Sequence, residues 1–251
     1  MSRLVRLTDS EWERVAPSLP RTTKTGGRNA KAHRPMFEAM IWILRTGGAV
    51  ARSARVVRAV AVGVHAILSL VTIGGLRRLV QGACTRTRWR RISDRCQHCA
   101  RPPGCVWRGK KSGAQEIGRS RGGPSTKIHA VVDALGNPVK LALSPGQTHE
   151  MKLAYTLLAD ISNAYVAGDR AYDAAPLAEM LEAHGCSVVI PSNPTRAKQR
   201  TYDRHLYRER CLVEHLFQRI KRFRRIAMRF EKLARNFLAF LHLVSILVWL
   251  R

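Results

Sequence analysis

The order of the apolar patterns between residues 125 and 191 constrains the fold of this chain more than any other feature. Ser125–Asp133 and Val139–Leu143 alternate in polarity around a Gly-Asn-Pro turn, which predicts a β-hairpin. Helical patterns and short apolar patterns then follow each other: Met151–Ile161, Tyr165–Asp169, Ala175–His184 and Cys186–Pro191. This succession predicts an α/β domain.

The stretch Tyr207–Lys221 places one carboxylate, Glu214, within an otherwise basic helical face. With about 100° per residue, Tyr207, Arg210, Glu214 and Lys221 fall on one narrow stripe of a single helix. The other side of that helix is apolar, with Leu212, Val213, Leu216, Phe217 and Ile220. The stripe is therefore either a solvated charged face or a site for chemistry.

The spacing Tyr-x2-Arg-x3-Glu-x6-Lys at these four positions resembles the signature of insertion-sequence transposases of the DDE type. Leu7–Trp12 and Leu44–Gly47 also resemble the N-terminal segment of that family. The order of the elements resembles the family's ribonuclease H-like core. The resemblance covers residues 1–47 and 110–251, and it implies metal-dependent phosphoryl transfer on DNA with two Mg²⁺ ions, for which Mn²⁺ can substitute.

The resemblance also implies roles for particular residues. Asp169 and Glu214 match catalytic, metal-binding carboxylates, whereas Tyr207, Arg210 and Lys221 match groups that orient DNA phosphates. Taken alone, Asp169 would more often be a helix cap. The Gly-rich segment that contains Arg119 and Arg121 suits phosphate binding, although its composition also fits a flexible linker.

The charge of the chain indicates a polyanionic partner. Lys and Arg number 44 against 17 Asp and Glu, which gives a formal net charge of +27. We therefore expect double-stranded DNA as the partner, bound with strong salt dependence, and a homo-oligomer on that DNA is compatible with the sequence. The basic segment Asn193–Arg204 adds to this surface.

The N-terminal segment predicts two helices. Thr8 and Glu11 form a capping-box pattern, and Pro35 is suited to the first turn of a second helix, Met36–Leu44. This pair is either a DNA-binding head or a plain helical cap on the catalytic domain.

Residues 48–106 differ from the rest of the chain in composition. They hold eleven Arg, no Lys, no Glu and one Asp, Asp94. Ala59–Leu76 carries no formal charge and is a marginal membrane-span candidate, but its glycines, its hydroxyl residues and His65 argue against insertion. The nearby Cys84, Cys96, Cys99 and Cys105, with His98, lack the paired spacing of most structural zinc sites.

A compensated frameshift explains this segment better. Back-translation of residues 48–106, read one base later with free codon choice, permits three stretches in family order that resemble the family's sequence. In that frame the first catalytic Asp lies under Arg95, and Asp94 is an accidental neighbour. The chain would then lack one of three catalytic carboxylates.

The sequence thus predicts a helical N-terminal domain (1–47), an aberrant segment that need not fold (48–109) and a ribonuclease H-like catalytic domain (110–251). The predicted protein is a transposase that is inactive because its first catalytic Asp is missing. The alternative is a non-catalytic basic DNA-binding protein. Since Met1–Arg6 leads into a polar segment, we expect a cytoplasmic protein at the bacterial nucleoid, not a membrane protein.

Overall fold

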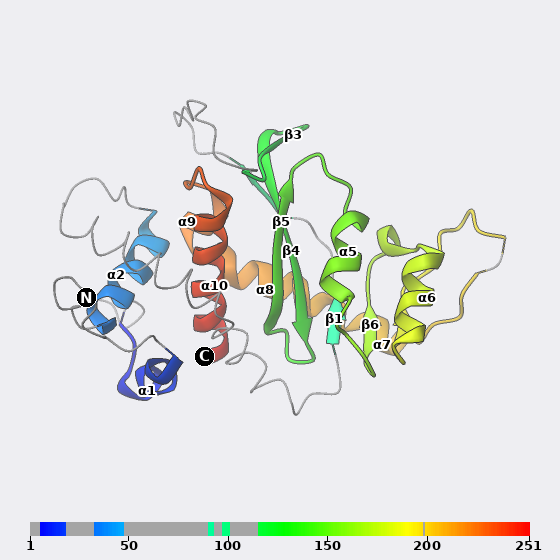
Figure 1. The fold of residues 1–251 in the computed structure, drawn as a ribbon, viewed down its shortest axis with the longest axis horizontal. Helices are drawn as coiled ribbons and strands as arrows, with labels where there is room; N and C mark the ends of the chain where they lie inside the picture. Colours follow the sequence, from blue (N-terminus) through cyan, green and yellow to red (C-terminus); the bar gives the residue numbers. More distant parts are fainter. Residues whose placement is uncertain (1–5, 19–32, 48–89, 93–96, 101–114, 198) are drawn as a thin grey trace, which may run out of the picture.

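The computed structural model describes residues 6–18, 33–47, 90–92, 97–100, 115–197 and 199–251. The described elements form an elongated molecule with the N-terminal helices at one end and the sheet in the middle (Figure 1). The helix α6 and the loop between β7 and α7 lie at the opposite end.

Strand β4 (Gly123–Asp133) is the centre of the larger sheet, because every other strand of that sheet pairs with it in antiparallel orientation. One edge of β4 pairs with β5 (Pro138–Pro145) over most of its length. The short strands are β1 (Arg90–Ile92), β2 (Gln97–Ala100) and β3 (Gly118–Ser120). Since β1 and β2 pair with the β4 residues that also pair with β5, they follow one another along its other edge.

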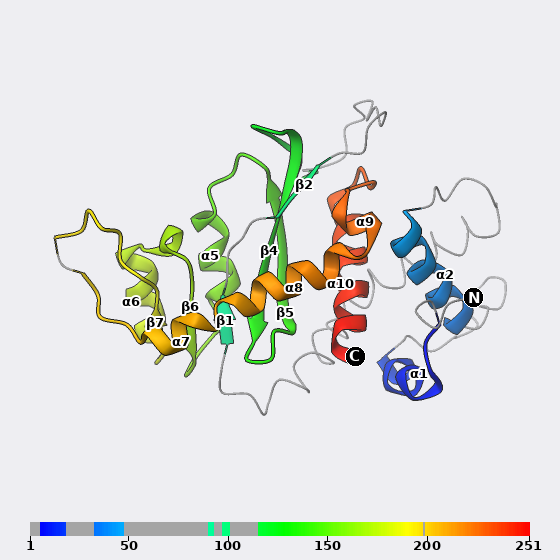
Figure 2. The ribbon, with the colours of Figure 1, turned by 180° about the vertical axis from the view of Figure 1, so that it is seen from behind.

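The second sheet consists of two parallel strands, β6 (Tyr165–Ala167) and β7 (Ser187–Val189). A 3₁₀ turn, η3 (Arg170–Tyr172), and the helix α6 (Ala175–Ala183) connect these strands. Strand β6 contacts β1. The strands therefore follow the spatial order β5, β4, β1, β6, β7 across the molecule (Figure 2).

The alternation along β4 divides the core into two layers. Ile128, Ala130 and Val132 belong to one apolar cluster, whereas Val131 belongs to the other. The first cluster lies under four helices: α2 (His33–Thr46), α8 (Cys211–Lys221), α9 (Arg224–Ala227) and α10 (Ala234–Leu250). The second lies under α6 and α5 (Met151–Leu158). Helix α8 crosses the sheet on the face seen in Figure 2.

The predicted hairpin is confirmed, and Asp133 explains its turn. The Asp133 side chain is buried and accepts hydrogen bonds from the backbone N–H groups of Leu135 (2.9 Å) and Asn137 (2.8 Å). Gly136 has a positive φ of 79°, a conformation that costs glycine little. The predicted succession of helices and strands after the hairpin is confirmed as well, although the first of these helices ends at Leu158 and not at Ile161.

The N-terminal helices form as predicted. Thr8 caps α1 (Asp9–Val15): its side chain accepts from the Glu11 N–H, and the Glu11 carboxylate accepts from the Thr8 N–H. A 3₁₀ turn, Ala16–Ser18, follows, and α2 begins at His33, before the predicted Met36. The buried residues of α1 and α2 belong to the same apolar cluster as α8 and α10. The helical pair is therefore built into the common core.

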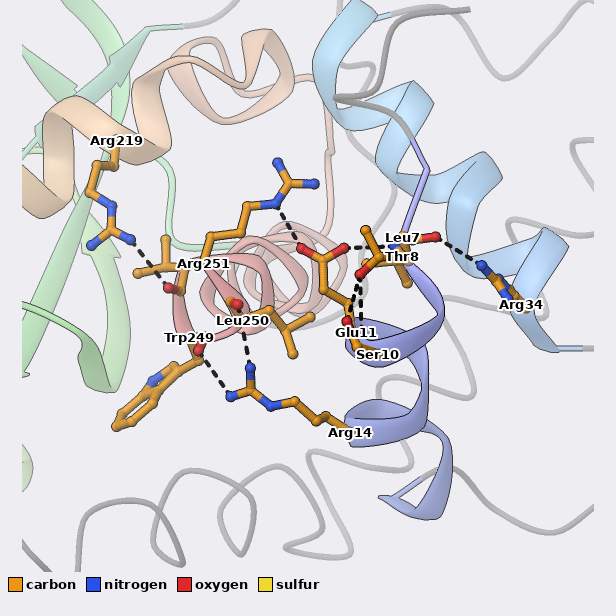
Figure 3. Close-up of polar contacts among 11 residues, drawn as sticks. Leu7, Thr8, Ser10, Glu11, Arg14, Arg34, Arg219, Trp249, Leu250 and Arg251 are labelled. Carbon is orange, nitrogen blue, oxygen red and sulfur yellow. Dashed lines mark hydrogen bonds and ion pairs between the residues drawn. The ribbon is translucent and has the colours of Figure 1, made fainter.

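Polar contacts also join the first helix to the last (Figure 3). Arg14 donates to the carbonyl groups of Trp249 (3.3 Å) and Leu250 (3.4 Å), which end α10. Arg251 forms an ion pair with Glu11 at 3.2 Å. From the side of the sheet, Arg219 of α8 donates to the Val248 carbonyl at 3.2 Å. The C-terminus of α10 is thus a junction between α1 and α8.

Helix α10 is largely buried and packs against β5 of the sheet. Within the described part of the chain, no helix combines the length and apolarity needed to cross a membrane. Ala59–Leu76 lies outside the described residues.

Candidate active site

Asp169 lies two residues after the end of strand β6, with Gly168 between them. Its backbone is extended (φ −71°, ψ 163°) and it precedes the η3 turn, but its side chain forms no capping hydrogen bond. Tyr172, which is buried, anchors that turn in the core, and Gly168 packs against Tyr172 and Ile190. The side chain of Asp169 is 27% exposed. Asp169 is therefore held at the surface by buried neighbours, and capping does not account for it.

The predicted continuous helix from Tyr207 to Lys221 is wrong in one respect. The segment forms two helices, α7 (Arg204–Arg208) and α8, which meet at Glu209 and Arg210. At the junction the Arg210 N–H donates to the Tyr207 carbonyl at 3.0 Å, a bond that spans three residues instead of four. This tighter turn is the 3₁₀ pattern, so Tyr207 and Glu214 do not lie on one continuous α-helix.

Arg210 connects the two predicted metal-binding carboxylates. Its Nε lies 3.1 Å from Asp169 Oδ1, and its Nη1 lies 2.8 Å from Glu214 Oε1. Side-chain exposures are 20% for Arg210, 27% for Asp169 and 25% for Glu214. One guanidinium thus brings together two acids that are far apart in sequence, one at the end of a strand and one on a helix.

The pKa of Arg210 reflects this arrangement. Partial burial lowers the pKa of the guanidinium, but the charges of Asp169 and Glu214 outweigh burial and raise it above its ordinary value. The Tyr207 ring lies 5.8 Å from the guanidinium, within cation–π range, and packs edge-on against Tyr202. Tyr207 therefore packs against the guanidinium of Arg210.

Lys221 is at the last residue of α8 and is exposed. Lys221 is seven positions after Glu214 in the sequence, which corresponds to about 10 Å along the axis of an α-helix. The contacts described around Arg210 do not include Lys221. The structure therefore brings three of the four signature residues together and leaves Lys221 at the far end of the same helix.

Arg119 and Arg121 are exposed at the β3–β4 hairpin. Gly123 turns this hairpin with a φ of 96°, and the Ser120 hydroxyl donates to the Gly123 carbonyl at 3.0 Å. The described end of the Gly-rich segment is therefore a hairpin and not a flexible linker. Figure 1 shows it at the opposite side of the sheet from α7.

The sequence did not single out Asp173 as a site residue. Asp173 lies close to Asp169 in sequence, and its buried side chain forms ion pairs with Arg196 and Arg200. The one available signal was the Asp-x3-Asp spacing ahead of a basic loop.

The described residues contain no cluster of three or more His, Cys, Asp or Glu side chains able to hold a metal ion. Asp94, Arg95 and the side chains of the proposed zinc cluster lie outside the described part of the chain. The described residues do contain a pair of partly exposed carboxylates that share one guanidinium. Mg²⁺ commonly takes one or two protein carboxylates and completes its shell with water and phosphate, so this pair fits such an ion.

Comparisons with known proteins identify the family of this chain. Residues 96–249 match the family model described as "Transposase DDE domain", and residues 7–50 match the model "Putative transposase of IS4/5 family (DUF4096)". The chain is 40% identical over 129 residues to "Putative transposase for insertion sequence element IS6501" of Brucella ovis, covering 51% of this chain and 99% of that relative. No solved structure matches. Since the first match alone spans more than half of the chain, this protein belongs to the DDE-type insertion-sequence transposases.

Proposed function

We propose that this chain descends from an enzyme that cleaves DNA and joins strands during transposition, with Asp169 and Glu214 as metal ligands. The observation that supports this most is the shared ion pairing of both carboxylates with Arg210. An arginine with a purely structural role does not require ion pairs with two partly exposed acids from separate elements.

The proposed cofactor is Mg²⁺, with Mn²⁺ as a substitute. When bound, a pair of such ions would activate water or a 3′-hydroxyl and stabilise the leaving oxygen. The chain's own residues supply the rest. Asp169 and Glu214 hold the site together, and Arg210 balances their charge and can donate to a phosphate. Exposed cations at Lys221, Arg119 and Arg121 would contact the DNA backbone.

We infer a ribonuclease H-like core from the strand order. β5, β4 and β1 are antiparallel neighbours, β1 contacts β6, and β6 runs parallel to β7. Helices cover both faces of this arrangement. This order and these pairings support the inference.

We further propose that the chain is catalytically defective because its first carboxylate was lost in a frameshift. The two family models leave residues 51–95 unmatched, which overlaps most of the segment of unusual composition. The position of the lost Asp, Arg95, falls in sequence between β1 and β2, which both pair with β4. Strand β1 contacts β6, the strand that precedes Asp169, and we expect the acid of the frame-restored chain to complete the proposed set of carboxylates.

The test compares this chain with a frame-restored chain on DNA that carries the element's own ends, in Mg²⁺ and in Mn²⁺. We expect strand cleavage only by the frame-restored chain, and we expect its Asp169→Asn variant to lose that cleavage. Cleavage by the present chain would contradict the proposed defect. An Asp94→Asn variant would then show whether Asp94 supplies the third carboxylate.

A second candidate function is non-catalytic DNA binding, which the net charge of +27 favours. Such a protein would bind DNA wherever it acts, at the ends of the element or at the nucleoid, as a monomer or as an oligomer. The discriminating variant is Glu214→Ala in cells that carry an intact relative. An unchanged effect on transposition would favour this function, and a lost effect would favour a role for the carboxylate site.

A further inference from the structure

Hydrogen bonds hold the described residues of the loop between β7 and α7, in which residue 198 lies outside the described part. The Arg200 N–H donates to the Ser192 hydroxyl at 2.8 Å, and the Arg196 N–H donates to the Asn193 carbonyl at 3.0 Å. These bonds bring the two ends of the segment 192–200 together. The loop lies at the end of the molecule opposite the N-terminal helices (Figure 1).

Asp173 fastens this loop to the segment that carries Asp169. Its side chain is only 1% exposed and accepts a hydrogen bond from the Asn193 N–H at 2.7 Å. Asp173 Oδ2 lies 3.1 Å from Arg196 Nε, and its Oδ1 lies 3.8 Å from Arg200 Nη1. Only the η3 turn separates Asp173 from Asp169.

The charges of this cluster need an explanation. A negative charge beside a surface that binds DNA weakens binding by simple electrostatics. Here the carboxylate is buried, while the two arginine side chains remain 32% and 24% exposed. The acid is thus shielded from solvent, and the cations that it orders keep part of their surface open.

We propose that Asp173 is a positioning residue for DNA: it holds Arg196 and Arg200 beside the Asp169 segment so that they contact phosphates next to the reacting bond. This inference rests on the proposed function, because it presupposes DNA binding. It assigns to the loop a fixed geometry instead of a diffuse positive charge. Ordered guanidinium groups lose less conformational freedom on binding a phosphate than a mobile loop would.

A role through charge alone and a role in positioning predict opposite changes in DNA affinity for one variant. Asp173→Asn removes one negative charge and so raises the net charge by one, and charge alone therefore predicts tighter DNA binding. Positioning predicts weaker binding, because Asn cannot hold two guanidinium groups. Asp203→Asn is the matched control: it makes the same charge change in the segment that follows the loop. Asn there can still cap α7, where Asp203 accepts from His205 at 2.7 Å.

The experiment measures fluorescence anisotropy of a labelled DNA duplex with the full-length chain over a series of salt concentrations. We expect Asp173→Asn to bind about tenfold more weakly than the unaltered chain near 0.15 M salt, and Asp203→Asn to bind equally or more tightly. Binding by Asp173→Asn that is as tight as that of Asp203→Asn would overturn the inference. Failure of the unaltered chain to bind DNA would instead overturn the proposed function, and this inference with it.

A variant cycle separates positioning from loss of folding. If Asp173 acts through Arg196 and Arg200, Asp173→Asn has no further effect on binding once Arg196→Gln and Arg200→Gln are both present. Thermal melting establishes whether each variant folds. Should Asp173→Asn not fold, Arg196→Gln and Arg200→Gln decide the matter: each should reduce the slope of log K against log salt by about 1. Unchanged slopes in both would overturn the inference.

Discussion

Two arginine clusters in this molecule look alike in sequence and differ in structure. Arg229 is 1% exposed, stacks on the Phe237 ring at 5.2 Å, and donates to backbone carbonyls such as Gln115 (2.7 Å) and Glu116 (3.0 Å). The side chain of Arg210 is 20% exposed, and its described ion-pair partners are the carboxylates of Asp169 and Glu214.

The difference lies in what each guanidinium can exchange. The carbonyl partners of Arg229 belong to the backbone of two segments, 115–116 and 231–232, so they cannot take another ligand without a change of the main chain. The neighbouring Arg225–Glu231 ion pair is also buried; burial raises the pKa of Glu231, although Arg225 opposes that shift. We expect the partly exposed carboxylates at Arg210 to be able to exchange the guanidinium for a cation. Burial of the partners therefore separates a structural arginine from the arginine of the proposed site.

The largest effect should come from the buried cluster. Arg229→Met removes a guanidinium that satisfies several buried carbonyls, and we expect a loss of about 3–5 kcal/mol in the free energy of unfolding. Urea denaturation measures it. Arg235→Met, which changes an exposed arginine in the first turn of α10, is the control and should have little effect. Similar losses in the two variants would remove the distinction between the clusters.

A second buried polar group should make stability depend on pH. His129 is 2% exposed, its Nε2 lies 2.8 Å from the Ser144 hydroxyl, and burial lowers its pKa from 6.5 to about 4. As the pH falls below 6.5, the unfolded chain takes up this proton before the folded chain does. Stability is therefore complete above about pH 6.5 and falls towards pH 4, by up to about 3 kcal/mol from this group.

Urea denaturation between pH 7 and pH 4 tests this pH dependence. We expect a shallower dependence in His129→Gln, while His215→Gln, at an exposed position of α8, should leave it unchanged. If His129→Gln retains the full slope, the acid sensitivity has another origin, and the buried layer does not differ from the surface site in this respect.

Local patterns were sufficient to predict much of this fold. The capping box at Thr8, the hairpin after Asp133 and the helices of the core each depend on residues a few positions apart. The signature spacing predicted that Arg210 and Glu214 lie on the same side of a helix, and their ion pair confirms that proximity. Local spacing decides such contacts because an α-helix brings residues four apart together.

Contacts between distant segments could not be predicted in this way. The ion pair of Arg210 with Asp169 depends on how α8 crosses the sheet, and the burial of Arg229 depends on where residues 115–116 pass. The break at Glu209 was missed because helical periodicity does not register a single tightened turn. The roles of Asp169, Glu214 and the DNA-binding residues stay predictions until variants are measured.

Arg210→Gln should have a small effect on stability and a distinct effect on metal binding. Its ion pairs are partly exposed, so we expect a change below about 1 kcal/mol in the free energy of unfolding. Without the guanidinium, the two carboxylates can hold Mn²⁺ without first losing a partner. We expect the Mn²⁺ dissociation constant to fall about fivefold, which corresponds to roughly 1 kcal/mol.

Electron paramagnetic resonance of free Mn²⁺, with the full-length chain and no DNA, measures this affinity independently of catalysis. Glu214→Gln is the control and should weaken Mn²⁺ binding. Equal affinities in Arg210→Gln and the unaltered chain would show that Arg210 does not compete with the cation. The contrast between the two arginine clusters would then be one of burial alone.

The smallest effect should come from a third arginine, which lies between the two cases. Arg14 is exposed, yet like Arg229 it donates to backbone carbonyls, those of Trp249 and Leu250. If partner type decides the energy, Arg14→Met should cost as much as Arg229→Met. If burial decides it, the loss should be only about 0.5 kcal/mol, the usual value for a cation at an exposed helix C-terminus. We expect the smaller value by urea denaturation, with its largest relative change at low salt, because water competes for exposed carbonyls and ions screen the helix dipole.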